Sequence, residues 1–149
     1  MKPSDIRSEL LRQHDDLRTR IRVTRAVAER CLAGEDLREE LRRLLTALTD
    51  AISAHNSREE ALMSKVFPEL DAWGPVRREV MVEEHILEHE KLVNALVETN
   101  GDSDPRPPAK VALELFDHMA AHMEREEKVF LGVDVLTDEE PPPDAFGGE

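Results

Sequence analysis

A short segment occurs twice in the sequence, and each copy pairs a histidine with a glutamate four residues later: His55 with Glu59, and His122 with Glu126. Both copies lie in long stretches whose apolar residues recur every three or four positions, as in an amphipathic helix. Residues four apart share one helix face, about 6 Å apart along the axis, so each pair offers a metal ion one nitrogen and one carboxylate. Two copies on different helices predict a metal site with approximate two-fold symmetry.

Four such helical stretches cover most of the chain, and no stretch alternates as a strand would. Glycine, proline and capping residues mark where each stretch begins and ends. The expected boundaries are Ser4 or Asp5 to Gly34, Glu35 to Pro68, Pro75 to Asn100, and a fourth helix that carries residues 111–129 after a polar, proline-rich loop at 101–108. Long helices with short connections predict an all-α fold, an up-down-up-down four-helix bundle with a metal site in its core.

The chain is long enough for one domain with its own core, which we expect to span residues 1–136. Residues 137–149 form an acidic tail rich in proline and glycine, with little apolar surface to bury, so we expect the tail to be disordered. The tail is also a candidate docking segment for a protein partner, although a solvated end is the simpler interpretation.

The charge of the chain limits its partners and its location. Charged residues make up 36% of the sequence and the formal net charge is −13, which argues against nucleic acid and anionic membranes as partners. No run of apolar residues is long enough to cross a membrane, and the N-terminus lacks an apolar signal core. Cys31 is the single cysteine, which excludes an internal disulfide and fits a reducing compartment. We therefore expect a cytoplasmic protein.

The histidines fall at one depth of the expected bundle. Counting outward from each of the three expected turns places all six in a single layer: His14, His55, His85, His89, His118 and His122. Six unrelated core histidines would be costly, because each buried imidazole needs a hydrogen-bond partner. A shared metal site accounts for all of them together.

The expected ligand set consists of five histidines and two carboxylates: His14, His55, Glu59, His85, His89, His122 and Glu126. If both carboxylates bridge two ions and an oxide or hydroxide is added, one ion has six ligands and the other has five. Imidazole with carboxylate suits iron, and an open position on reduced iron is where dioxygen, or another small diatomic ligand, could bind. Zinc and manganese are also chemically possible.

This pattern resembles that of the hemerythrin-like (HHE cation-binding) domain family, four-helix bundles that hold a non-haem di-iron site. The family pattern is a lone histidine, then His-x-x-x-Glu, His-x-x-x-His and His-x-x-x-Glu. It is matched between residues 10 and 131 by His14, by His55 with Glu59, by His85 with His89, and by His122 with Glu126. The resemblance implies the following roles: six-coordinate iron on His85, His89 and His122, iron with the open position on His14 and His55, and bridging by Glu59 and Glu126.

Two positions leave alternatives open. Some members of the family place the second bridging carboxylate one residue later, which here would be Glu127, whereas the internal repeat with Glu59 favours Glu126. His118 is extra to the family pattern. Its simplest interpretation is a core histidine hydrogen-bonded beside the site, and the alternative is an additional ligand.

Other metal proteins fit the sequence less well. His85-Ile86-Leu87-Glu88-His89 matches the His-x-x-Glu-His pattern of inverted zinc peptidases, but no strand is expected that could align a peptide. A ferritin-like site needs a glutamate three residues before a histidine, and no histidine here has one.

The predicted function is that of a non-haem di-iron protein whose two ions share a bridging oxide or hydroxide. This protein would bind dioxygen reversibly, store it or sense it. The alternative is a di-iron oxidoreductase acting on peroxide, nitric oxide or iron, so whether the protein is an enzyme stays open. The expected neighbours of the site, Leu10, Leu17, Ile52 and Leu62, carry no hydroxyl groups. Apolar walls slow proton entry and so favour holding dioxygen over reducing it.

Overall fold

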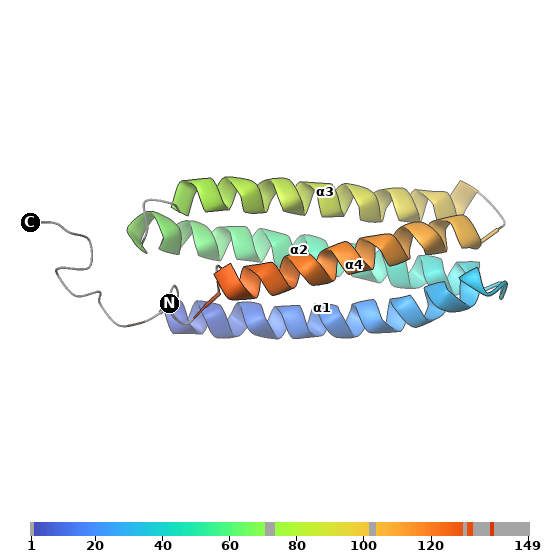
Figure 1. The fold of residues 1–149 in the computed structure, drawn as a ribbon, viewed down its shortest axis with the longest axis horizontal. Helices are drawn as coiled ribbons and strands as arrows, with labels where there is room; N and C mark the ends of the chain where they lie inside the picture. The colour runs from blue at the N-terminus through green and yellow to red at the C-terminus, as the bar shows by residue number, and fades with distance from the viewer. Residues whose placement is uncertain (1, 71–73, 102–103, 130, 133–137, 139–149) are drawn as a thin grey trace, which may run out of the picture.

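A computed structural model of the chain shows four long helices and, within the residues it describes, no strand. It describes residues 2–70, 74–101, 104–129, 131, 132 and 138, and their side chains except at 67–70, 74–78 and 101. The helices are α1 (Pro3–Leu32), α2 (Arg38–Leu70), α3 (Gly74–Gly101) and α4 (Arg106–Val129). They run up, down, up and down along one long axis (Figure 1), and each packs against its two neighbours in the cyclic order α1, α2, α3, α4. The predicted all-α bundle is confirmed.

Gly34 ends α1 as expected, and it does so in a left-handed backbone conformation with φ of 99°. The Gly34 amide donates to the Cys31 carbonyl at 3.1 Å, and the Glu35 amide donates to the Arg30 carbonyl at 3.1 Å. These two bonds satisfy carbonyls that the end of a helix leaves open, and glycine adopts the required φ without steric cost.

The expected helix ends were wrong by a few residues where proline was taken as a boundary. The first helix begins at Pro3, ahead of the expected cap at Ser4 or Asp5, and the second continues through Pro68 to Leu70. The fourth begins at Arg106, so the prolines at 107 and 108 lie in its first turn rather than in a loop. A first-turn residue has no helical acceptor for its amide, so proline costs nothing there. Of the expected tail, 137 and 139–149 lie outside the described residues.

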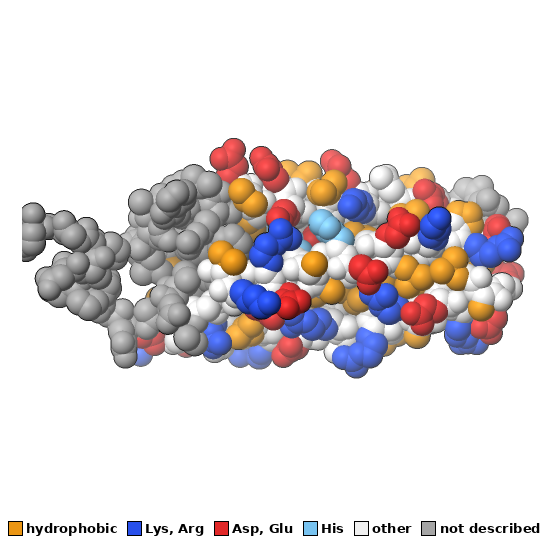
Figure 2. Space-filling model, in the orientation of Figure 1, with side chains coloured by type: hydrophobic (Ala, Val, Ile, Leu, Met, Phe, Trp, Pro, Cys, Tyr) orange, Lys and Arg blue, Asp and Glu red, His pale blue; other side chains and the backbone are white. Residues whose placement is uncertain are grey.

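Apolar side chains fill the bundle on both sides of a polar layer. The cluster toward the α1–α2 connection includes Leu17, Ile52, Leu92 and Met119. The cluster toward the other end includes Leu10, Leu62, Met81 and Leu131. The face shown in Figure 2 mixes acidic and basic side chains, and histidine reaches it only as a small patch near the middle. The described part of the chain contains no helix that is long and apolar enough to cross a membrane.

Candidate metal centre

The polar layer draws histidine or glutamate from every helix of the bundle. The residues that meet at its centre are His14 from α1, His55 and Glu59 from α2, His85 from α3, and His122 and Glu126 from α4. All six are buried, from His14 at 0% exposed to His55 at 6%. They form two groups whose nitrogen and oxygen atoms lie within 4.8 Å of one another, and Glu126 belongs to both. Helical spacing thus brings six ionisable side chains to one depth of the bundle, between the two apolar clusters.

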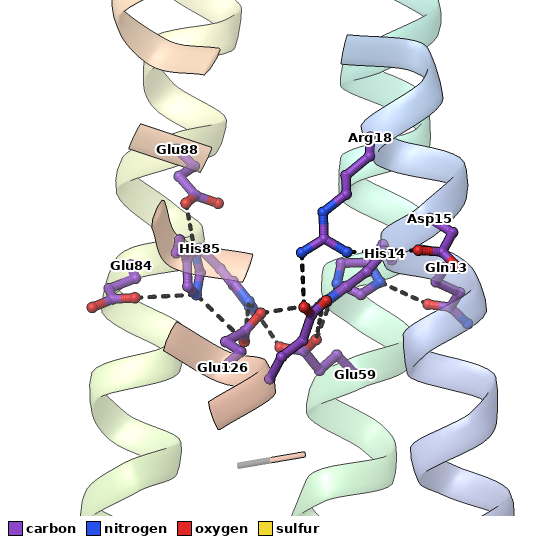
Figure 3. Close-up of polar contacts among 12 residues, drawn as sticks. Gln13, His14, Asp15, Arg18, Glu59, Glu84, His85, Glu88 and Glu126 are labelled. Atoms are coloured by element: carbon purple, nitrogen blue, oxygen red, sulfur yellow. Dashed lines mark hydrogen bonds and ion pairs between the residues drawn. The ribbon is translucent and has the colours of Figure 1, made fainter. Parts of the chain in front are cut away.

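Each of the two central carboxylates points one oxygen to each pair of histidines (Figure 3). Glu59 Oε2 lies 3.0 Å from His55 Nε2 and 3.5 Å from His14 Nε2, whereas its Oε1 lies 3.2 Å from His85 Nε2. Glu126 Oε1 lies 3.3 Å from His14 Nε2, whereas its Oε2 lies 3.3 Å from His122 Nε2. Both carboxylates therefore span a His14–His55 pair and a His85–His122 pair.

The outer nitrogen of each of these histidines contacts an oxygen from the preceding helix of the cyclic order. Gln13 Oε1 is 2.7 Å from His55 Nδ1, Glu60 Oε1 is 3.2 Å from His85 Nδ1, Glu88 Oε1 contacts His122 Nδ1, and Glu127 Oε2 is 2.9 Å from His14 Nδ1. All four partner atoms are acceptors, so each Nδ1 carries the proton that it donates. This contact fixes the tautomer and directs the Nε2 lone pair inward, the arrangement found around metal-binding histidines.

The centre of the layer is chemically incomplete without a cation. His14 Nε2, His122 Nε2, Glu59 Oε1 and Oε2, and Glu126 Oε2 are buried atoms with no hydrogen-bond partner. With Nδ1 as the donor, every one of these inward atoms is an acceptor, and a buried unsatisfied acceptor costs about 1–3 kcal/mol. A positive ion satisfies several acceptors at once, and imidazole nitrogen with carboxylate oxygen is a donor set suited to iron, zinc or manganese. The residues present thus fit a bound metal.

When no ion is present, protons on the central histidines supply positive charge to the layer instead. Burial lowers the pKa of the His14 and His85 imidazoles, but contacts with Glu126 and Glu59 outweigh it and raise each pKa to about 10. Burial likewise opposes the contacts of His122 with Glu126 and Glu88, which raise its pKa to about 10. The pKa of Glu59 falls well below its usual value, because its contacts with the surrounding side chains outweigh burial. The centre therefore attracts positive charge strongly.

Comparison with protein-family models matches residues 5–133 to the hemerythrin HHE cation binding domain. The chain belongs to the hemerythrin HHE cation-binding family. Comparison with curated proteins gives no match, and comparison with solved structures gives none. The family resemblance noted in the sequence is therefore confirmed, and the buried histidine and glutamate layer is the feature of this HHE domain that suits a cation.

The HHE domain places Glu126, rather than Glu127, at the centre. Glu126 is 2% exposed and lies in both groups of donor atoms. Glu127 instead contacts the outer nitrogen of His14 and accepts a hydrogen bond from Arg18 Nη2 at 2.8 Å. Burial raises the pKa of Glu127, but the bonds to Arg18 and His14 outweigh it and lower the pKa overall. This placement agrees with the repeat between Glu59 and Glu126.

His89, the seventh residue of the expected ligand set, lies apart from both groups. It is half-buried and lines a surface pocket of about 320 Å³ between α2 and α3, together with His85 and Glu60. Glu88 is turned inward instead, 3% exposed, where it contacts His122. The buried stripe of α3 includes Met81, His85, Glu88, Leu92 and Ala95, so this helix turns Glu88 rather than His89 toward the centre of the bundle. A stripe through His89 has the same alternating spacing of three and four residues, so the spacing along α3 did not single out Glu88.

His118 and Glu84 complete the surroundings of His122. His118 Nε2 lies 3.8 Å from Glu88 Oε1, and the side chain is about one third exposed, so it lies beside the layer rather than at its centre. Glu84 Oε2 lies 3.1 Å from His122 Nε2, and Arg125 pairs with the other Glu84 oxygen at 3.2 Å. The sequence pattern of this HHE domain gave no sign of Glu84, because it lies one residue from His85 at the edge of the buried stripe.

Proposed function

We propose that this HHE domain is a non-haem di-iron protein that binds dioxygen reversibly, with an oxide or hydroxide bridging the two ions. The observation that carries the proposal is the pair of central carboxylates, each with one oxygen toward the His14–His55 pair and one toward the His85–His122 pair. A single ion would use only one side of this arrangement. Two iron ions bound there would supply a redox couple and a coordination position for a diatomic ligand.

The side chains around the layer favour holding a small apolar molecule. A cavity of about 10 Å³, about the space that one water molecule needs, adjoins the histidines. Besides the histidines and Glu126 of the layer, its lining contains two polar side chains, Asn56 and Glu88, and four apolar ones without hydroxyl groups: Leu17, Ile52, Met119 and Met123. The apolar part of the lining limits the access of water and so slows proton delivery, which favours retention of the ligand over its reduction.

The test is anaerobic reconstitution with iron(II), followed by oxygenation and removal of oxygen. We expect about two iron ions per chain and a visible absorption change that appears with oxygen and disappears when oxygen is removed. In this proposal the diatomic ligand binds at the ion held by His14 and His55. His14→Leu should therefore abolish that change while about one ion remains, because the variant removes a nitrogen from the His14–His55 pair only.

Three results would contradict the proposal. A single tightly bound zinc with no uptake of iron would exclude a di-iron site. Rapid irreversible oxidation, or consumption of hydrogen peroxide over many turnovers with a reductant, would indicate an oxidoreductase instead. Normal oxygenation of His14→Leu would place the diatomic ligand at the other pair of histidines.

A further inference from the structure

The four oxygens that hold the outer histidine nitrogens differ in charge between the two pairs. On the His14–His55 pair they come from the Gln13 amide and from Glu127. On the His85–His122 pair both come from carboxylates. An anion bonded to the outer nitrogen increases the electron donation of an imidazole to its metal, so the two metal positions are not electrostatically equivalent.

The outer contacts of the His14–His55 pair carry no net charge. Gln13 donates through Nε2 to Glu9 Oε1 at 3.3 Å, which orients its own Oε1 toward His55 Nδ1 at 2.7 Å. The charge of Glu127 is balanced by Arg18, whose Nη2 donates to Glu127 Oε1 at 2.8 Å. Glu9 is in turn paired with Arg58 at 2.7 Å. Glu127 and Glu9 are thus each paired with an arginine; Arg18 also lies 3.6 Å from Asp15, whose charge solvent screens because that side chain is 80% exposed.

The outer contacts of the His85–His122 pair carry two carboxylates that are not paired with a described lysine or arginine, although His118 Nε2 lies 3.8 Å from Glu88 Oε1. No described lysine or arginine lies within ion-pair distance of Glu60 or Glu88, and Glu88 is only 3% exposed. The remaining acid on this side, Glu84, is balanced by Arg125. The outer contacts here thus carry two more negative charges than those of the His14–His55 pair. Solvent screens the charge of Glu88 only weakly because Glu88 is buried, whereas Glu60 is 36% exposed and is screened more.

We propose that Glu60 and Glu88 make the His85–His122 position selective for the ion of higher charge, whereas Gln13 and the Arg18–Glu127 pair leave the His14–His55 position to a divalent ion. The inference rests on the proposed di-iron function. In a half-reduced protein the ferric ion then occupies the His85–His122 position, and the ferrous ion occupies the position nearer to His14.

The test is a redox titration, at pH 8, of the full-length protein loaded with two iron ions. We expect two iron(III)/iron(II) couples. The couple of higher reduction potential, the upper couple, belongs to the His14–His55 position, and the couple of lower potential, the lower couple, belongs to the His85–His122 position. Glu88→Gln keeps the shape and the acceptor oxygen but removes the charge. We expect a 10- to 100-fold weaker preference for iron(III) at that position, which raises the lower couple by about 60–120 mV and leaves the upper couple in place.

Gln13→Glu is the matched variant, because it adds a carboxylate at the equivalent contact of the other pair. We expect it to lower the upper couple by a similar amount and to leave the lower couple in place. Both variants therefore narrow the gap between the couples, from opposite sides. Since Gln13 is only half-buried, this variant also tests the inference if Glu88→Gln does not fold.

The outcomes separate this inference from the proposed function. Two bound irons whose couples do not respond, or move together in both variants, would overturn the charge asymmetry and leave the di-iron function standing. A folded wild-type protein that takes up fewer than two irons would overturn both.

Discussion

Neighbouring glutamates on α4 offer the sharpest test of how the centre is built. Glu126→Ala removes Oε1 from the His14 side and Oε2 from the His122 side, so both groups of donors lose an oxygen. Glu127→Ala removes only the partner of His14 Nδ1 and of Arg18. We expect the first variant to lose both ions under conditions in which the second keeps them.

The magnitudes follow from what each oxygen contacts. Loss of an outer partner of a metal-binding histidine costs 10- to 100-fold in affinity, about 1.4–2.7 kcal/mol, and here at one position only. Loss of Glu126 removes a charged donor atom from both positions, so each affinity should fall by more than that. The lost ion pair with Arg18 adds little to the cost of Glu127→Ala, because Arg18 is 37% exposed.

The assay is metal per chain after dialysis against free metal at about 100 times the wild-type dissociation constant. Glu127→Ala should then remain at least half loaded at its weakened position and fully loaded at the other, whereas Glu126→Ala should bind less than one ion. Circular dichroism checks that both variants remain helical. If Glu127→Ala empties the site while Glu126→Ala stays loaded, the bridging carboxylate is one residue later and the register argued from Glu59 is wrong.

Further predictions concern stability and protons. Removal of both ions from protein held at about 100 times the dissociation constant should lower Tm by roughly 5–11 °C per ion, measured by thermal circular dichroism, and equal Tm values would argue against a buried metal site. Since the pKa of His14, His85 and His122 is about 10 without metal, zinc binding at pH 8 should release protons and tighten as pH rises toward 10. Calorimetry in buffers of different ionisation enthalpy measures that release, and its absence would contradict the raised pKa values. The raised pKa of His14 means that protonated His14 stabilises the metal-free fold. This stabilisation is fully present below pH 6.5 and is lost as pH rises through about 10. Phe116→Ala should cost about 3–5 kcal/mol in urea unfolding yet leave the metal content unchanged, because Phe116 is 0% exposed within the apolar cluster rather than in the polar layer.

The shared depth of the layer was predictable because it depends only on helix length and turn position. His14 and His55 lie equally far from the turn at Gly34, and an error of two residues in a helix end leaves them neighbours. The repeat with Glu59 also made the register of Glu126 predictable, because the same spacing on two helices needs the same face inward. The boundaries at Pro3 and at the prolines of 107 and 108 failed for a local reason, since proline near a helix start costs nothing.

The inward face of α3 was not predictable from periodicity. A stripe through Glu88 and a stripe through His89 both contain His85 and Leu92. The two alternatives differ in the rotation of α3 about its axis by about half of the 100° step between successive residues. That rotation is set by packing against α2 and α4 together. The outer partners were hidden for a related reason: Gln13 and Glu60 each reach a histidine on another helix, a contact that no spacing within one helix reveals.

The ring of outer contacts also selects the handedness of the bundle. Four antiparallel helices joined in sequence can turn clockwise or anticlockwise about their common axis, and inward apolar stripes alone fit either arrangement. The contacts α1 to α2, α2 to α3, α3 to α4 and α4 to α1 exist in only one of them, because Gln13 lies on the flank of α1 that faces α2. In the opposite arrangement these polar side chains would face the wrong neighbour and four buried imidazoles would lose their acceptors. The polar layer therefore discriminates between two topologies that the apolar core does not distinguish.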